Sequence, residues 1–163
     1  MLKPFVALMA LALLAASPAS AADSSVWAYR AVKTSRPLPR IVAAAERGDA
    51  RAQAQLGFMY ATGRSVPQNY ALASHWYRRG AEQGHPAAQH LLGLMYDKGF
   101  GVPADYVLAH MWLSLAAAGT RGDVHEDNIR LRDAVGGKLS LGQLADAQQL
   151  AAGWFPKPEV VRR

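Results

Sequence analysis

The strongest constraint on this chain is an internal repeat. Residues 45–76 read AERGDARAQAQLGFMYATGRSVPQNYALASHW, and residues 81–112 read AEQGHPAAQHLLGLMYDKGFGVPADYVLAHMW. The second copy starts 36 residues after the first, and 16 of the 32 aligned positions are identical. A period of this length marks an array of supersecondary units, each of which needs a neighbour to bury its apolar face. Such arrays present extended surfaces, so the repeat favours binding over catalysis.

Each copy is predicted to fold as a helix, a loop and a second helix. A glycine follows the last apolar position of each first helix, at Gly63 and Gly99, where helices commonly end in a left-handed residue. A Val-Pro pair then prevents the helix from continuing. The first copy should have its first helix over about residues 50–61, and the second helices should end near residues 79 and 117. The residues expected to cap these helices are Asp49, Asn69, His85 and Asp105.

A glycine also lies in the middle of each first helix, at Gly57 and Gly93. Glycine there costs roughly 1 kcal/mol relative to alanine, so its presence in both copies predicts close approach of a neighbouring helix. The shared apolar positions follow the helical period and are predicted to be core rather than a cofactor site. They are Ala52, Leu56, Met59 and Tyr60 in the first copy and Ala88, Leu92, Met95 and Tyr96 in the second.

The flanking segments are predicted to be degenerate units of the same array. Between Gly122 and Gly137 lies a polar helix, and Ser140 caps a last helix whose apolar positions form one stripe. A terminal unit with a polar outer face is what a solenoid needs for solubility. The stripe consists of Leu141, Leu144, Ala147 and Leu150.

Upstream, residues 38–48 resemble a second helix, and Ser24 to Lys33 could supply its partner. The predicted boundaries are a signal peptide at 1–22, a domain at 23–154, clear repeats at 45–80 and 81–116, a terminal unit at 121–154 and a flexible tail at 155–163.

The first 22 residues are predicted to be a cleaved secretory signal peptide. Lys3 supplies the positive start, residues 5–16 form an apolar run too short to span a bilayer, and small residues before Ala22 form a cleavage site. The chain has no cysteine, which excludes a lipoprotein anchor, disulfides and a thiolate nucleophile. Its net charge of +6 favours anionic envelope surfaces as partners, while export argues against nucleic acid.

The repeat motif resembles a known family. The pattern A-E-x-G-x-x-x-A-Q-x-x-L-G-x-M-Y-x-x-G-x-x-V-P-x-[ND]-Y-x-L-A-x-x-W is similar to the Sel-one-like repeat, the 36-residue relative of the tetratricopeptide repeat, and residues 44–117 carry it twice. The resemblance implies an all-α fold, a right-handed α-solenoid of helix-loop-helix repeats, and a role as a protein–protein adaptor. A branch of the family linked to β-lactam hydrolysis has paired cysteines, and that activity is not carried over because this chain has none.

Catalytic and metal-binding patterns are absent from the sequence, and no cofactor is expected. No two histidines are spaced i, i+4, and Ser74 and His75 point apart on a helix. The glycine-rich loops lack the Lys-Ser/Thr of a phosphate loop. His85 is explained as a cap, and the other four histidines are expected to be partly exposed helix residues.

Positions that differ between the copies are the candidates for partner binding, because the shared fold explains the identical ones. On the first helices they form a stripe, which the family resemblance places on the concave face and whose composition suits a peptide. The alternative is that Phe58 and Leu94 are core, and the sequence does not decide between the two. The stripe, called the first-helix stripe below, consists of Arg51, Gln55, Phe58, Thr62, Leu91, Leu94 and Lys98.

These observations predict an exported, non-catalytic scaffold that binds another protein or peptide in the bacterial envelope. One alternative is an envelope-surface module that binds cell-wall polymer or anionic lipid through its basic charge. The other is a hydrolase of cell-wall or β-lactam substrates, for which no catalytic constellation is visible.

Overall fold

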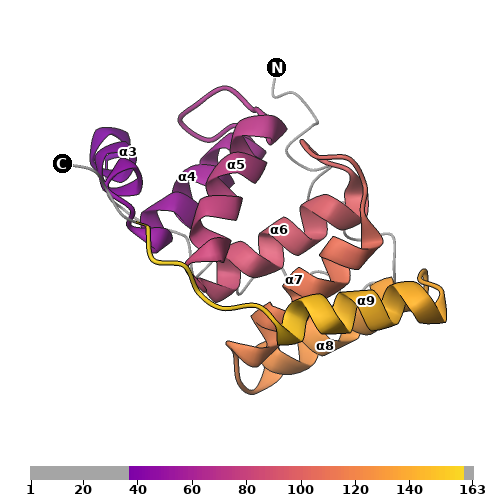
Figure 1. Cartoon of the computed structure of the whole chain (residues 1–163). Coiled ribbons are helices and arrows are strands. Elements are labelled where there is room, and N and C mark those ends of the chain that lie inside the picture. Colours follow the sequence, from indigo (N-terminus) through magenta and orange to yellow (C-terminus); the bar gives the residue numbers. More distant parts are fainter. Residues whose placement is uncertain (1–36, 160–163) are drawn as a thin grey trace.

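The computed structural model of the chain describes residues 37–159, and within that range it contains helices and no strands (Figure 1). The predicted signal peptide, the segment Ser24 to Lys33 and residues 160–163 lie outside the described residues. The helices are α3 (Leu38–Glu46), α4 (Ala50–Thr62), α5 (Tyr70–Glu82), α6 (Pro86–Lys98), α7 (Tyr106–Ala118), α8 (Asp123–Gly136) and α9 (Leu141–Ala152).

Consecutive helices pack on one another as in a solenoid. The pairs α4–α5 and α6–α7 form the two clear units, and α5 packs on α6 to join them. The helix α3 packs on α4, and α7 is covered by α8 and α9 at the other end (Figure 1). The predicted all-α solenoid is confirmed, including the helix expected over residues 38–48.

The predicted caps and glycine helix ends are confirmed, but α5 runs on to Glu82, beyond its predicted end near residue 79. Gly63 and Gly99 follow their helices in the left-handed conformation, each with φ of 70°. At Ser140 the side chain and Gln143 form a reciprocal capping box at the start of α9. Each predicted cap side chain accepts a hydrogen bond from the backbone N–H three residues later: Asp49, Asn69 and Asp105 at 3.0 Å, and His85 through Nδ1 at 3.3 Å.

Close approach at the two mid-helix glycines is also confirmed. A Cβ on Gly57 would lie 2.6 Å from Cδ1 of Tyr77, and a Cβ on Gly93 would lie 2.9 Å from Cγ of Leu113. Tyr77 and Leu113 are fully buried, so neither can retreat. The two glycines therefore set the distance between the helices of each unit.

The terminal unit packs less tightly than its apolar stripe predicted. Of the four stripe residues on α9, Ala147 is buried and Leu144 is partly buried, whereas Leu141 is 89% exposed and Leu150 is 46% exposed. The structure thus leaves two leucines of the predicted stripe in contact with solvent, because α9 is the last helix of the described range and packs mainly on α7.

Beyond α9 the chain turns back along the array. The residues after Ala152, yellow in Figure 1, run from the end of α9 past α5 toward α3. A flexible tail was expected from residue 155, but residues 155–159 make specific contacts with the first unit, as described below. We call residues 154–159 the C-terminal segment.

Candidate functional site

The first-helix stripe does not form one continuous exposed surface. Arg51 and Lys98, at its two ends, are exposed. Phe58, Thr62 and Leu91 are partly buried, and Gln55 and Leu94 are buried.

Leu94 is 9% exposed and belongs to the buried residues of the core. Phe58 and Leu91 pack against the larger core cluster, formed mainly by α5, α6 and α7. A side chain already surrounded by its own fold has little surface left for a partner, so the structure favours the core alternative for Leu94. The exposed part of the stripe is its charged ends.

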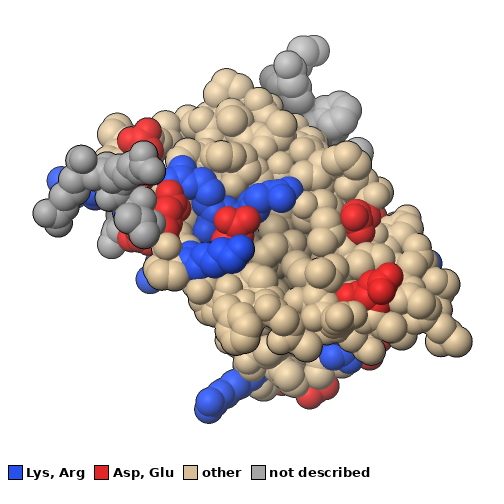
Figure 2. Space-filling view, viewed as in Figure 1, with Lys and Arg blue, Asp and Glu red and all other residues tan. Residues whose placement is uncertain are grey.

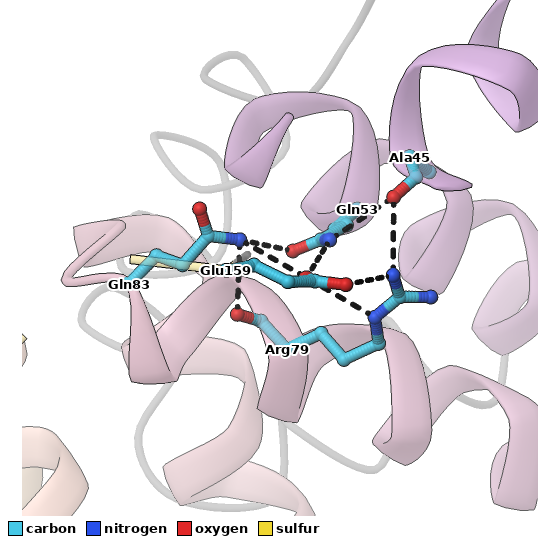
Figure 3. A network of polar contacts seen from close by, with 5 residues as sticks. All are labelled: Ala45, Gln53, Arg79, Gln83 and Glu159. Carbon is cyan, nitrogen blue, oxygen red and sulfur yellow. Dashed lines mark hydrogen bonds and ion pairs between the residues drawn. The ribbon is translucent and has the colours of Figure 1, made fainter. Parts of the chain in front are cut away.

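A second cluster, not anticipated from the sequence, surrounds the carboxylate of Glu159 (Figure 3). We call the side chains of Gln53, Arg79 and Gln83, together with the carbonyl of Ala45, the carboxylate cradle. Arg79 forms an ion pair with Glu159 through Nη2 and places its Nε 3.3 Å from Oε2. Gln53 Nε2 donates to the same oxygen at 2.6 Å, and Gln83 Nε2 lies 3.5 Å from it.

The cradle comes from three helices. Gln53 is near the start of α4, Arg79 is in the last turn of α5, and Gln83 is the C-terminal cap of α5. Ala45, in α3, contributes its carbonyl oxygen, which accepts from Gln53 Nε2 at 3.0 Å. Figure 2 shows Lys and Arg side chains gathered beside and over α5 on this face of the molecule.

The electrostatics of the cradle favour a charged carboxylate. Partial desolvation raises the pKa of Glu159, but hydrogen bonds from Arg79 and Gln53 and the Arg79 charge outweigh it and hold the pKa below its usual value. Charge-assisted hydrogen bonds of this kind are among the stronger ones in proteins. The arrangement binds a carboxylate through hydrogen bonds and an ion pair.

The rest of the C-terminal segment lies along the same edge of the array. Trp154 contacts Trp112 edge to face, with ring centroids 6.2 Å apart, and packs against the larger core cluster. Lys157 donates its backbone N–H to the Glu82 carbonyl at 2.8 Å. The segment therefore touches the second unit at its start and the first unit at its end.

Comparisons with known proteins match this fold. The model of the Sel1 repeat matches residues 50–85 and 86–120. A crystal structure of a Sel1 repeat protein from Oxalobacter formigenes is 37% identical, with a TM-score of 0.55, over 78% of this chain and 98% of that one. The chain belongs to the Sel1 repeat family. Its family repeats have the expected period but begin at the first residue of α4 and of α6 rather than at residues 45 and 81.

A second solved structure is similar over more of the chain. A protective antigen present in uropathogenic Escherichia coli strains, which displays an SLR fold, is 31% identical with a TM-score of 0.65 over 81% of this chain. The chain spans only 29% of the length of that antigen. No curated protein matches the chain. Sel1 repeats generally mediate protein–protein interactions, and their fold is generally a non-catalytic scaffold.

The cradle could have been found by a wider comparison of the two Sel1 repeats. Arg79 and Gln83 correspond to Leu115 and Gly119, 36 residues later, so both differ between the copies. The first-helix stripe contains only positions on the first helices, whereas Arg79 lies in the second helix of its unit and Gln83 caps that helix. Glu159 carried no such signal because it lies outside the repeats.

Two of the histidines are buried, contrary to the expectation of partial exposure. His90 has no exposed surface, and its Nδ1 lies 2.8 Å from Oδ1 of Asn128 in α8. Asn128 uses its amide N–H groups on Val124 and Thr120, so its oxygen accepts and His90 carries its proton on Nδ1. Burial lowers the pKa of His90 to about 4, although the Asn128 hydrogen bond opposes this. His90 is a neutral core residue.

His110 is buried where α7 meets α8 and α9, beside an open cleft of about 340 Å³. Ser114 and Asp133 also line this cleft, which raises the question of hydrolytic chemistry. The Ser114 hydroxyl instead donates to the His110 backbone carbonyl at 2.8 Å, and Nδ1 of His110 has no hydrogen-bond partner in the described part of the chain. The nucleophile and base are therefore not paired, and the cleft gives the hydrolase alternative no support.

Residues 37–159 contain neither a cluster of metal ligands nor a membrane-spanning helix. No group of three or more His, Asp or Glu side chains there could hold a metal ion. In the same range, no helix has the length and apolar character needed to cross a membrane.

Proposed function

We propose that this Sel1 repeat protein is an exported scaffold that binds another protein or peptide in the bacterial envelope. The observation that carries the proposal is the C-terminal segment itself, an extended stretch of polypeptide held along the array through an aromatic side chain, a backbone hydrogen bond and a carboxylate. Main-chain hydrogen bonds, aromatic contacts and arginine–carboxylate pairs are contacts by which proteins recognise extended peptides, and solenoids present extended surfaces that can hold them. The family's general role in protein–protein interaction supports the same conclusion.

Export rests on the first 22 residues, and it makes a direct prediction. Intact-mass analysis of the protein from the envelope fraction should find a chain that begins within a residue of Ala22, because the charged start, short apolar run and small residues form a signal peptide. A mature protein that still contains residues 1–16 would contradict export by cleavage.

The partner can be sought by crosslinking the full-length protein in native envelopes and capturing it through an affinity tag. We expect one dominant protein partner. Reversing the exposed stripe charges, Arg51→Glu with Lys98→Glu, should reduce its capture at least threefold at low salt and less at high salt, because exposed charges steer association.

Arg121→Glu is the matched control, since Arg121 is also exposed but lies at the other end of the described array. Equal capture by the stripe variant and the control would remove the stripe from the binding surface. If the protein captures isolated cell wall or anionic lipid instead of protein, and if salt abolishes that capture, the envelope-surface alternative replaces the scaffold.

A further inference from the structure

The C-terminal segment is attached to the array by few contacts after Trp154. Phe155 is 73% exposed, and Pro156, Lys157 and Pro158 are exposed as well. The remaining attachments are the backbone bond from Lys157 and the Glu159 carboxylate, whose side chain is 28% exposed. A stretch with so little buried apolar area can detach while the helices stay folded.

The members of the cradle bind one another as well as Glu159, so its geometry does not depend on the carboxylate alone. Cζ of Arg79 lies 4.5 Å from the centroid of the Trp76 ring. Nη2 of Arg79 lies 3.5 Å from the carbonyl oxygen of Ala45. Gln83 Nε2 donates to Gln53 Oε1 at 2.7 Å and lies 3.3 Å from the Arg79 carbonyl. The donors therefore stay aimed at the carboxylate position when the carboxylate leaves, which lowers the cost of binding another one.

The repeat itself separates what the fold needs from what the cradle adds. Gln53 and its counterpart Gln89 make the same bond to a carbonyl eight residues earlier, at 3.0 and 3.2 Å, so this glutamine is part of the shared fold. The second unit has Leu115 and Gly119 in place of the cradle's Arg79 and Gln83. The second unit thus folds without these two polar side chains, whereas in the first unit both contact the Glu159 carboxylate.

We propose that the carboxylate cradle is a recognition site for an acidic side chain in an extended segment of a partner protein, with an aromatic residue five positions before it, and that the chain's own C-terminal segment occupies this site until the partner displaces it. The spacing is that of Trp154 and Glu159, the occupant seen in the structure. The inference rests on the proposed function, because it names the chemistry of the partner that the scaffold takes.

Because the chain's own C-terminal segment occupies the cradle, it competes with any partner and so regulates partner binding. A tethered segment has an effective concentration in the millimolar range, so a free peptide of equal intrinsic affinity competes poorly. The apparent affinity for a partner falls by the fraction of molecules whose cradle is open. A partner must therefore make more contacts with the array than the C-terminal segment does, or the segment must dissociate from the cradle first.

The test uses the full-length chain and a labelled, amidated peptide with the sequence of residues 153–159, GWFPKPE, with binding measured by fluorescence anisotropy. A vacated chain carries Trp154→Ala with Glu159→Lys, which removes the aromatic anchor and places a cation beside Arg79. We expect the peptide to bind the vacated chain at least tenfold more tightly than the wild-type chain. The Glu159→Gln form of the peptide should bind the vacated chain at least tenfold more weakly than GWFPKPE.

Adding Arg79→Leu to the vacated chain should abolish the preference for the acidic peptide. Leucine is the residue at the equivalent place in the second repeat, so the fold accepts it, and Arg121→Leu removes the same charge elsewhere as a control. Circular dichroism checks each variant. If the vacated chain does not fold, the chain with Glu159→Lys alone takes its place, and it should still bind the peptide more tightly than wild type.

Three results would overturn the assignment: no gain in the vacated chain, equal binding of the two peptides, or binding that Arg79→Leu leaves unchanged. A wild-type dimer in sedimentation that Glu159→Lys dissociates would also overturn it, because the occupant would then be a second copy of this chain. Partner capture from envelopes is measured separately. If capture succeeds and the peptide test fails, only the cradle assignment falls, whereas failure of capture removes the proposed function.

Discussion

Replacing Phe58 and Leu94 together by alanine is expected to lower the free energy of unfolding by about 3 kcal/mol or more. Leu94 is buried in α6, and truncating a buried leucine to alanine costs about 2–5 kcal/mol, since the lost contacts leave a cavity. Phe58 is partly buried against the larger core cluster and adds to the loss. Urea denaturation followed by circular dichroism measures the change.

The matched control is Leu72→Ala on α5, because Leu72 is 40% exposed and its truncation leaves little cavity. We expect its effect to be well under half that of the double variant. A double variant as stable as wild type would show that both side chains face a partner and not the core. Weakened partner capture by that folded variant would then restore Phe58 and Leu94 to the binding surface.

Acidification from pH 7 to pH 5 is expected to destabilise the protein by about 2 kcal/mol through His90 alone. The pKa of His90 is about 4 in the fold, against an ordinary value of 6.5. Between these values the unfolded chain binds a proton that the folded chain refuses, so stability falls by up to about 1.4 kcal/mol per pH unit. Above pH 6.5 both states are neutral, and below pH 4 both are protonated, so the loss is confined to that window.

His90→Gln isolates this contribution. Glutamine does not titrate, and its amide can still donate to Asn128 Oδ1, which accepts from His90 in the fold. The urea concentration at the unfolding midpoint should decrease less from pH 7 through pH 6 to pH 5 for the variant than for wild type. Burial also lowers the pKa of His85 and His110, so both proteins retain a common acid sensitivity. Parallel pH profiles for the two proteins would show that His90 is not the buried neutral group described above.

The local structure of each unit was predictable because its signals lie within a few residues of one another. A cap bonds to the N–H three residues later, and a left-handed glycine ends the helix that precedes it. Each signal occurs in both copies of the repeat, so Gly57 and Gly93 could be interpreted as the same close helix contact in two successive units. Both proved to lie against a buried side chain of the paired helix.

The depth of individual side chains was harder to predict. His90 stands where the first copy has Ala54, and the helical period alone places both on an inner face without saying how deep. His90 is buried because Asn128, 38 residues later, supplies its hydrogen bond from α8. Without a partner of that kind, a buried polar ring would be costly. The expectation of partial exposure was wrong for His90 for this reason, whereas His110 is buried because residues of α8 and α9 lie over this part of α7.

The sequence by itself determined the class of this protein: an array of helix-loop-helix units, with its caps, helix ends and close helix contacts. These follow from short-range hydrogen bonds and from a period repeated along the chain. Only the tertiary structure decided which side chains meet in the carboxylate cradle and which residues of the first-helix stripe are buried. Glu159 meets Arg79 across 80 residues of sequence, and Leu94 is buried by neighbouring helices. Neither outcome is encoded locally, because each depends on how separate units come to lie against one another.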